Sequence, residues 1–211
     1  MIALIYIISG IFININLFYY LTEIVTNKWN IYNVKSLLII INSVLITCMC
    51  MLFLNNYILL DTIQSYLYYL IGFYIFDLYY LYNYETSKEL YIKILHHTLA
   101  ICGIVLFKNV PIIASKLLLT EIVNIPLEIR FIAIRNDYKK KAVKSIMEIL
   151  IYILFAIYRI MYPFKDYCLV CKKQPYYYCI IFSMLYILWF YWFILINIKV
   201  YKILSNIIKY M

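Results

Sequence analysis

The sequence has little of three things that a soluble protein uses freely: charge, glycine and proline. Charged residues make up 14% of the 211 positions, and there are three glycines and four prolines. A soluble domain needs about twice this share of charge to cover its surface, and the scarcity of glycine and proline argues against a flexible linker or low-complexity tail. What is there is apolar, since 67% of the residues are hydrophobic and the mean hydropathy is +0.88. This composition predicts an all-α integral membrane protein.

Seven apolar runs are long enough to cross a bilayer as helices, which takes about 20 mostly apolar residues. They cover roughly residues 2–21, 35–54, 65–84, 91–107, 110–134, 145–163 and 176–204. Only Lys108 and Asn109 separate the fourth run from the fifth, so these two form either a tight hairpin or one broken element. The first run has no basic residues before it and no small-residue cleavage site after it, so we interpret it as a retained span. The predicted fold is a polytopic transmembrane helix bundle of about seven spans.

Basic residues fall unequally on the two sides of this arrangement. Twelve lie on the side of the C-terminus: Lys28, Lys35, Lys88, Lys93, Arg135, Lys139, Lys140, Lys141, Lys144, Lys199, Lys202 and Lys209. Four lie on the other side: Lys108, Lys165, Lys172 and Lys173. Because basic loops are retained in the cytosol, we predict a cytosolic C-terminus and a lumenal N-terminus. The net charge of +9 is mostly this asymmetry, so we expect no nucleic-acid partner.

Ionisable residues inside the predicted spans are the functional candidates, because a charge at the bilayer centre costs about 3 kcal/mol on insertion scales. They are Asp77, His96, His97, Glu121, Glu128, Arg130, Glu148 and Arg159. At 1.5 Å per helical residue, Asp77 lies about 10 Å from the predicted cytosolic end of its span, and the two histidines lie about 8–9 Å from that end of theirs. The third and fourth spans therefore present one carboxylate and two imidazoles at one level.

The fifth predicted span has a polar face, formed by Glu121, Asn124 and Glu128 at positions i, i+3 and i+7. We expect this face to point into the bundle. Glu148 and Arg159 lie nearer the ends of the sixth span and are expected to reach toward the interface.

A neutral imidazole can act as a base or nucleophile near pH 7, so we assign a candidate catalytic group of Asp77, His96, His97 and Glu121. A structural Asp–His or Glu–Arg clamp is the competing interpretation. For Arg130 and Arg159 we favour such a structural role, in which each neutralises a carboxylate.

The six cysteines say less about function. Four of them, Cys48, Cys50, Cys102 and Cys179, lie in apolar runs and are expected to be packing residues. Cys168 and Cys171 form a C-x-x-C pair in the last non-cytosolic loop. One such half-site cannot hold zinc, so we expect no metal site. Either a local disulfide in an oxidising lumen or two free thiols would fit this pair.

Several of these residues also resemble a known family pattern. The segment Gly72-Phe-Tyr-Ile-Phe-Asp77, followed by Leu95-His96-His97-Thr98-Leu99-Ala100, looks like the signature of the TLC-domain family, which includes the ceramide synthases. Leu119-Thr120-Glu121 leading to Ile129-Arg130-Phe131, and the aromatic stretch Trp189–Phe193 before a basic tail, are similar to the smaller members of that family. The resemblance runs from about residue 28 to residue 204.

The resemblance implies an endoplasmic-reticulum-type protein with a six-helix TLC domain in residues 28–205. One transmembrane span in residues 1–27 would precede it, and a short cytosolic tail in residues 206–211 would follow. It also implies work on membrane lipids, or sensing of them. Polar residues of the spans, namely Asn124, Glu128, Arg130 and Arg159, would then be structural or would line a lipid cavity.

In the ceramide synthases, paired histidines and downstream aspartates serve acyl transfer from acyl-CoA to a sphingoid amine. This chain keeps both histidines but has Glu121 and Asn124 where the aspartates are expected. We therefore expect a role in membrane lipid homeostasis or lipid sensing first, and an acyl-CoA-dependent N-acyltransferase second. No cofactor is expected, and acyl-CoA would be a co-substrate in the second case alone.

Overall fold

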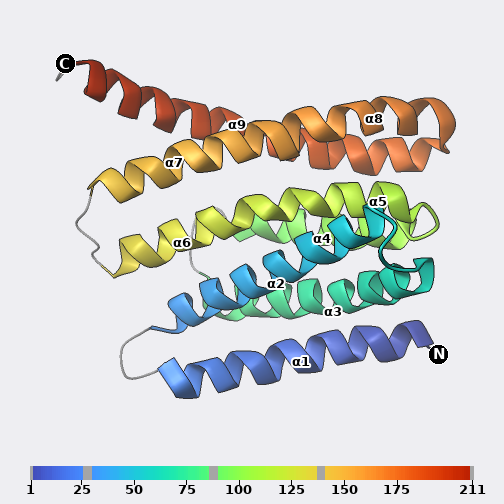
Figure 1. The fold of residues 1–211 in the computed structure, drawn as a ribbon. Helices are drawn as coiled ribbons and strands as arrows, with labels where there is room; N and C mark the ends of the chain where they lie inside the picture. The colour runs from blue at the N-terminus through green and yellow to red at the C-terminus, as the bar shows by residue number, and fades with distance from the viewer. Residues whose placement is uncertain (1, 26–29, 86–89, 137–140, 210–211) are drawn as a thin grey trace.

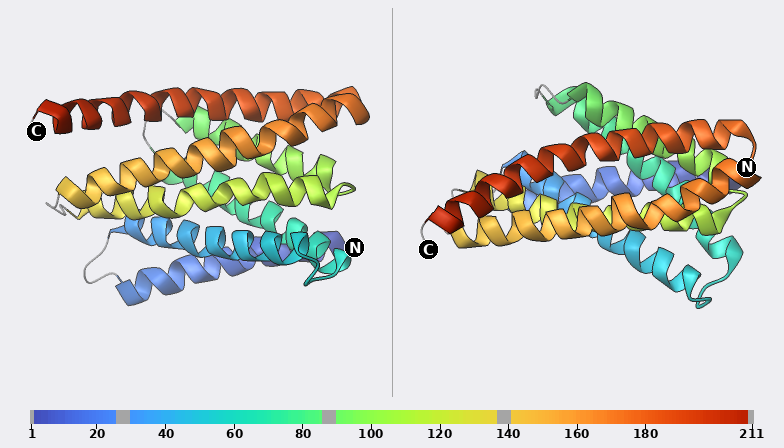
Figure 2. Two further views of the ribbon diagram at one scale, coloured as in Figure 1. Left: turned by 45° about the horizontal axis from the view of Figure 1, so that its top comes forward. Right: turned by 90° about the horizontal axis from the view of Figure 1, so that it is seen from above.

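The computed structural model describes residues 2–25, 30–85, 90–136 and 141–209, and the secondary structure of these residues is entirely helical. The elements are α1 (Ile2–Val25), α2 (Ile31–Leu54), α3 (Leu60–Tyr84), α4 (Leu90–Phe107), α5 (Pro111–Leu118), the 3-10 turn η1 (Leu119–Val123), α6 (Asn124–Arg135), α7 (Lys141–Phe155), the π-helical turn η2 (Ala156–Met161), α8 (Tyr162–Lys173) and α9 (Tyr176–Lys209). They lie side by side in one bundle, with α1 and α9 at opposite edges (Figures 1 and 2). The two chain termini lie at opposite ends of the bundle (Figure 1).

Two continuous stretches contain more than one element, and we name them the fifth rod (α5, η1 and α6) and the sixth rod (α7, η2 and α8). Five helical stretches of the described residues are long and apolar enough to cross a membrane: Ile2–Ile24, Ile31–Leu54, Leu90–Phe107, Ser145–Lys172 and Tyr176–Ser205. They fit the expected all-α, multi-pass integral membrane protein. The predicted third span is rich in tyrosine, and the 3-10 turn divides the predicted fifth, so the count of seven spans stays a prediction.

Two boundaries differ from those predicted. The sixth rod continues to Lys173, beyond the predicted end at residue 163. Pro163, the last residue of the predicted span, lies in the first turn of α8, directly after the π-helical turn, where a missing N–H is tolerated. In addition, α9 reaches Lys209, so most of the predicted 206–211 tail is helical. The predicted boundary between residues 27 and 28 lies outside the described part of the chain.

The fourth and fifth predicted spans form a tight hairpin. Helix α4 ends at Phe107 and α5 begins at Pro111, and the Val110 N–H donates to the Phe107 carbonyl at 2.8 Å. Helix α5 carries Pro111 in its first turn, where proline is tolerated because the N–H of that position has no intrahelical acceptor.

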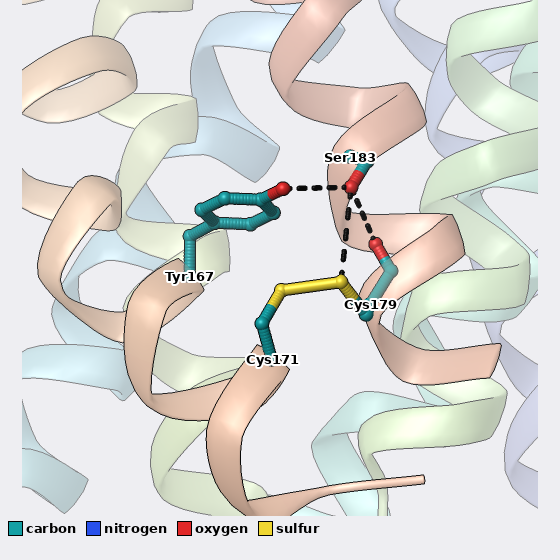
Figure 3. The surroundings of a disulfide bond; sticks show 4 residues. All are labelled: Tyr167, Cys171, Cys179 and Ser183. Atoms are coloured by element: carbon teal, nitrogen blue, oxygen red, sulfur yellow. Dashed lines mark hydrogen bonds between the residues drawn. A yellow bond between two sulfur atoms is a disulfide. The ribbon is translucent and has the colours of Figure 1, made fainter. Parts of the chain in front are cut away.

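A disulfide joins α8 to α9 at the short turn between them. It links Cys171 to Cys179, whose Cα atoms are 5.1 Å apart, while Cys168 has a free thiol. Beside it, Ser183 Oγ donates to the Cys179 carbonyl at 2.7 Å and lies 3.1 Å from the Tyr167 hydroxyl (Figure 3). The expectation that Cys179 only packs was therefore wrong, as was the placement of Cys171 in a loop. On helix α8, Cys171 faces the start of α9, which the sequence spacing of a C-x-x-C pair does not reveal.

Candidate functional site

A buried ion-paired group joins α2, α3 and α4. His97 Nε2 on α4 lies 3.0 Å from Asp77 Oδ2 on α3, and Lys35 Nζ on α2 contacts the other carboxylate oxygen, Oδ1. The Asp77 side chain is 4% exposed and the His97 side chain is 17% exposed. One carboxylate thus bridges a lysine and a histidine in an interior where an unpaired ion would cost on the order of several kcal/mol.

The positions of these residues along their helices explain why they meet. Asp77 is seven residues before the end of α3, and His97 is seven residues after the start of α4. At 1.5 Å per residue both lie about 10 Å from the connection between the two helices. Lys35 is only four residues into α2, but its long chain turns inward. Its Nζ lies 5.0, 5.5 and 6.0 Å from the ring centroids of Tyr80, Phe76 and Phe73.

His96 faces a different neighbour, because adjacent residues of a helix point about 100° apart. Its ring packs edge-on against Trp192 of α9, with centroids 5.0 Å apart. It also lines a cavity of about 30 Å³, together with Tyr74, Ala100, Gly103, Ile104, Ala114, Leu117, Leu118, Thr120, Glu121, Leu185 and Trp189. A space of this volume has room for about one water molecule, so it is a small, mostly apolar niche with a few polar groups and no acyl-chain channel.

Glu121 belongs to a second polar group, where η1 meets η2. Asn124 Nδ2 donates to Glu121 Oε2, and Asn124 Oδ1 accepts from Arg159 Nη2 at 2.8 Å. Arg159 Nε also donates to the Thr120 carbonyl at 3.3 Å. Glu121 and Asn124 are neighbours because side chains at i and i+3 eclipse one another in a 3-10 turn. The π-helical turn that contains Arg159 is the kind of local irregularity that often occurs at functional sites.

These two polar groups touch one another through aromatic and imidazole rings. The His96 and His97 centroids are 5.4 Å apart, and the Tyr74 ring lies 5.6 Å from His97. Tyr74 and His96 in turn line the cavity beside Glu121. We expected Asp77, both histidines and Glu121 to converge on one cavity. In the structure they form two adjoining groups, with Asp77 and His97 in one, and His96 and Glu121 in the other.

Glu128 lies further along the fifth rod than Glu121 and meets α2. It accepts from Ser36 Oγ of α2 at 2.5 Å, and Arg135 Nη1 donates to the same Ser36 Oγ at 2.8 Å and to the Tyr32 carbonyl at 2.9 Å. With about 120° per residue in the 3-10 turn and about 100° per residue after it, Glu121 and Glu128 stay within roughly 40° of one another around the rod. They have different partners because seven residues separate them along its axis.

Glu148 and Arg159 were expected near the interface, and this expectation was wrong. They are buried, with 5% and 3% of their surface exposed. Each has a partner inside the bundle, since Arg130 Nε of α6 lies 2.5 Å from Glu148 Oε1 of α7 and Arg159 contacts the second polar group. A paired charge has no need to reach the interface.

Lys35 is the residue that the sequence analysis missed, since it was counted as a cytosolic loop lysine. Its position held a usable signal. Lys35, Leu38 and Asn42 recur at i, i+3 and i+7, which is one helical face, and all three are buried. Two lysines expected on the cytosolic side, Lys139 and Lys140, lie outside the described residues.

The geometry permits acid–base chemistry on a polar group held inside the membrane. His97 Nε2 faces Asp77 Oδ2 at 3.0 Å, and its other ring nitrogen, Nδ1, is buried with no hydrogen-bond partner among the described residues. Within the same residues no three His, Cys, Asp or Glu side chains are grouped to hold a metal ion.

The chain matches no known protein-family model, no curated protein and no solved structure.

Proposed function

We propose that this protein handles membrane lipids, as an enzyme or a sensor of their polar groups, in the way its resemblance to the TLC-domain family implies. The Asp77–His97 pair carries the proposal. One imidazole nitrogen is held by the carboxylate at 3.0 Å while the other is buried without a partner among the described residues. His96 Nδ1 is also buried without a partner among those residues, so the two adjacent rings each present an open nitrogen inside the bundle. An imidazole oriented by a carboxylate, with its second nitrogen free, is the arrangement of a general base.

The depth of the pair supports a lipid as the ligand. His97 lies about 10 Å along α4 from the end of that helix, in a stretch apolar enough to cross a membrane. A solute without an apolar part does not reach this depth at tolerable cost. A lipid brings its hydroxyl, amine or ester group there by keeping its chains among the apolar side chains on the outside of the bundle, where many large hydrophobic residues are exposed.

An acyl-CoA-dependent N-acyltransferase is the second candidate, and the free His97 Nδ1 favours it. In that reaction the nitrogen takes a proton from the lipid amine, the amine attacks the thioester carbonyl of acyl-CoA, and CoA leaves as the thiol. We rank it second because Glu121 and Asn124 stand where the resemblance leads us to expect a pair of aspartates. The cavity beside His96 is also too small for an acyl chain.

The orientation proposed from the sequence keeps its support, and the proposed location in the endoplasmic reticulum rests on the resemblance alone. If the buried Lys35 is left out of the count, eleven basic residues lie on the predicted cytosolic side and four on the lumenal side. The Cys171–Cys179 disulfide lies at the end that we assign to the lumen, and disulfides persist in oxidising compartments. Both observations favour a lumenal N-terminus and a cytosolic C-terminus.

The test is lipid analysis of membranes from cells that make or lack the protein, with His97→Ala and Asp77→Asn variants. Asn16→Ala is a matched control, since its side chain is exposed and bonds only the Phe12 carbonyl of its own helix. We expect a change in lipid composition with the wild type and the control, and a loss of that change with both site variants. Identical lipid compositions with and without the protein would contradict the lipid proposal. Purified protein that binds no acyl-CoA would remove the acyltransferase alternative alone.

A further inference from the structure

Lys35 is an unusual lysine for a membrane protein, because it does not extend to the interface. It begins about 6 Å from the end of α2, within reach of water for a side chain of its length. Only 6% of its surface is nevertheless exposed, and its Nζ lies among the rings of Tyr80, Phe76 and Phe73. Burial of an ammonium ion is unfavourable unless the ion is paired. Asp77 is the partner that compensates this burial.

The Asp77 carboxylate has two oxygens, and each is engaged by a different helix. Lys35 on α2 holds Oδ1 and His97 on α4 holds Oδ2. A bare carboxylate beside an imidazole in an apolar interior draws a proton onto the ring. A carboxylate already neutralised by a lysine does this far less. The charge state of His97 therefore depends on Lys35, although the two side chains contact different oxygens of Asp77.

Other charged groups also surround His97. Lys93 and Arg159 add positive charge, and Glu121 adds negative charge from the second polar group. Because Lys93 pairs with Glu85 at 3.1 Å, Lys35 is the cation that balances Asp77 beside the ring, and with it in place an imidazolium is disfavoured. A neutral ring that donates through Nε2 keeps Nδ1 available as a base.

We propose that Lys35 is a positioning residue that neutralises Asp77, and so holds His97 as a neutral imidazole with its proton on Nε2 and its Nδ1 free. The proposal rests on the proposed function, because it concerns the residue that we assign as the base. It assigns a third member to the Asp77–His97 pair, drawn from α2.

The chain offers a clean test, because it contains only two histidines. Purified protein labelled with ¹⁵N-histidine is placed in lipid nanodiscs at pH 7, and His96→Gln identifies the His97 ring signals. We expect the wild-type ring to be neutral and protonated on Nε2. A wild-type His97 that is an imidazolium, or that carries its proton on Nδ1, would overturn the proposal without any Lys35 variant.

Variants of Lys35 then test whether the lysine controls the charge of the His97 ring. With Lys35→Met we expect the protonated-to-neutral ratio of His97 to rise by at least tenfold, since a unit charge a few ångströms away is worth on the order of a hundredfold at an effective dielectric constant of about 20. Lys35→Arg should restore the neutral ring. Lys116→Met is the matched control, because Lys116 pairs with Asp166 at 2.9 Å on other helices, and it should leave His97 unchanged.

A His97 ring that is the same in Lys35→Met and wild type would show that Lys35 serves stability alone, and it would overturn the inference. This readout needs no lipid activity. The lipid analysis can therefore fail while the ring behaves as expected, and the reverse can also happen, so the two proposals are tested separately.

Discussion

The backbones of α1 and α3 meet at Gly10 and Gly72. A Cβ added to Gly72 would lie 2.9 Å from the Gly10 Cα and 2.3 Å from the Ile7 carbonyl oxygen, and one added to Gly10 would lie 2.3 Å from the Tyr69 carbonyl oxygen. Backbone atoms of packed helices cannot move aside as a flexible side chain does. Close approach of this kind through small residues is a common means of helix association in membranes.

We therefore expect Gly10→Ala and Gly72→Ala each to destabilise the protein by about 1–3 kcal/mol through overpacking. Gly103→Ala is the control, because its added Cβ would meet only the Leu185 Cδ1 atom at 3.8 Å, an ordinary contact. Thermal unfolding in detergent, followed by tryptophan fluorescence, measures the three variants. Equal stability of all three would show that the α1–α3 contact is looser than described here.

The Arg130–Glu148 ion pair joins α6 to α7, and removal of one partner should be costly. Arg130→Met or Glu148→Leu alone leaves an uncompensated charge, for which we expect a loss of about 3–5 kcal/mol. The double variant should lose less than either single one, because no buried ion remains. A double-mutant cycle of unfolding free energies in detergent measures this coupling. Additive single effects would argue against the pair.

The disulfide pairing can be checked by counting thiols. Blocking of free thiols in denaturant, followed by reduction and labelling with a maleimide polymer, should add two labels to the wild type. Cys168→Ser should also gain two labels, whereas Cys179→Ser should gain none, because Cys171 then has no bonded partner. If Cys168→Ser gains none and Cys179→Ser gains two, the pair is the C-x-x-C alternative.

Loss of the native disulfide should also lower stability, and by an amount typical of a short closed loop. The bonded cysteines are eight residues apart, and closing a loop of this size restricts the unfolded chain by roughly 2–3 kcal/mol. Reduction of the purified wild-type protein should lower its unfolding temperature, while Cys179→Ser should be insensitive to the reductant. An unfolding temperature that falls equally in both would point to another cause.

Single cysteines at the two ends of α3 test the orientation. Tyr57 is 78% exposed in the turn before α3, and Asn83 near the end of α3 bonds only the Tyr79 carbonyl of its own helix. In sealed microsomes with the free native cysteines replaced, we expect an impermeant maleimide to label Asn83→Cys at once. Tyr57→Cys should be labelled only after detergent opens the vesicles. The opposite pattern would invert the topology.

Much of the fold could be predicted from the sequence because a bilayer allows few solutions. Backbone groups in hydrocarbon must be satisfied within the segment, so long apolar runs with little glycine and proline become helices. The predicted limits of α2 and α4 agree with the structure to within a few residues. The predicted end of the sixth span was early by ten residues, since the chain stays helical through the π-helical turn and past Pro163 to Lys173.

The depth of a residue in its predicted span indicated some of the contacts between ionisable side chains and missed others. Asp77 and His97 were placed at one level on consecutive helices, and Asp77 Oδ2 lies 3.0 Å from His97 Nε2. Lys35 was assigned to the wrong environment, because a lysine close to a helix end extends outward in most membrane proteins. Its inward turn depends on an aromatic face of α3 and on Asp77, which lie on another helix.

By itself, the sequence determined that this chain is an all-helical membrane protein and which ionisable residues its interior must accommodate, because hydrophobic length and the cost of a buried charge are properties of local segments. Only the tertiary structure decided which partner each of those residues meets. Glu121 met the π-helical turn and Glu128 met α2 because they lie at different heights on the fifth rod, and Cys171 met Cys179 because α8 stayed helical as far as the turn. The rotation and local winding of a helix depend on its packing against all the others at once, and no single segment contains that information.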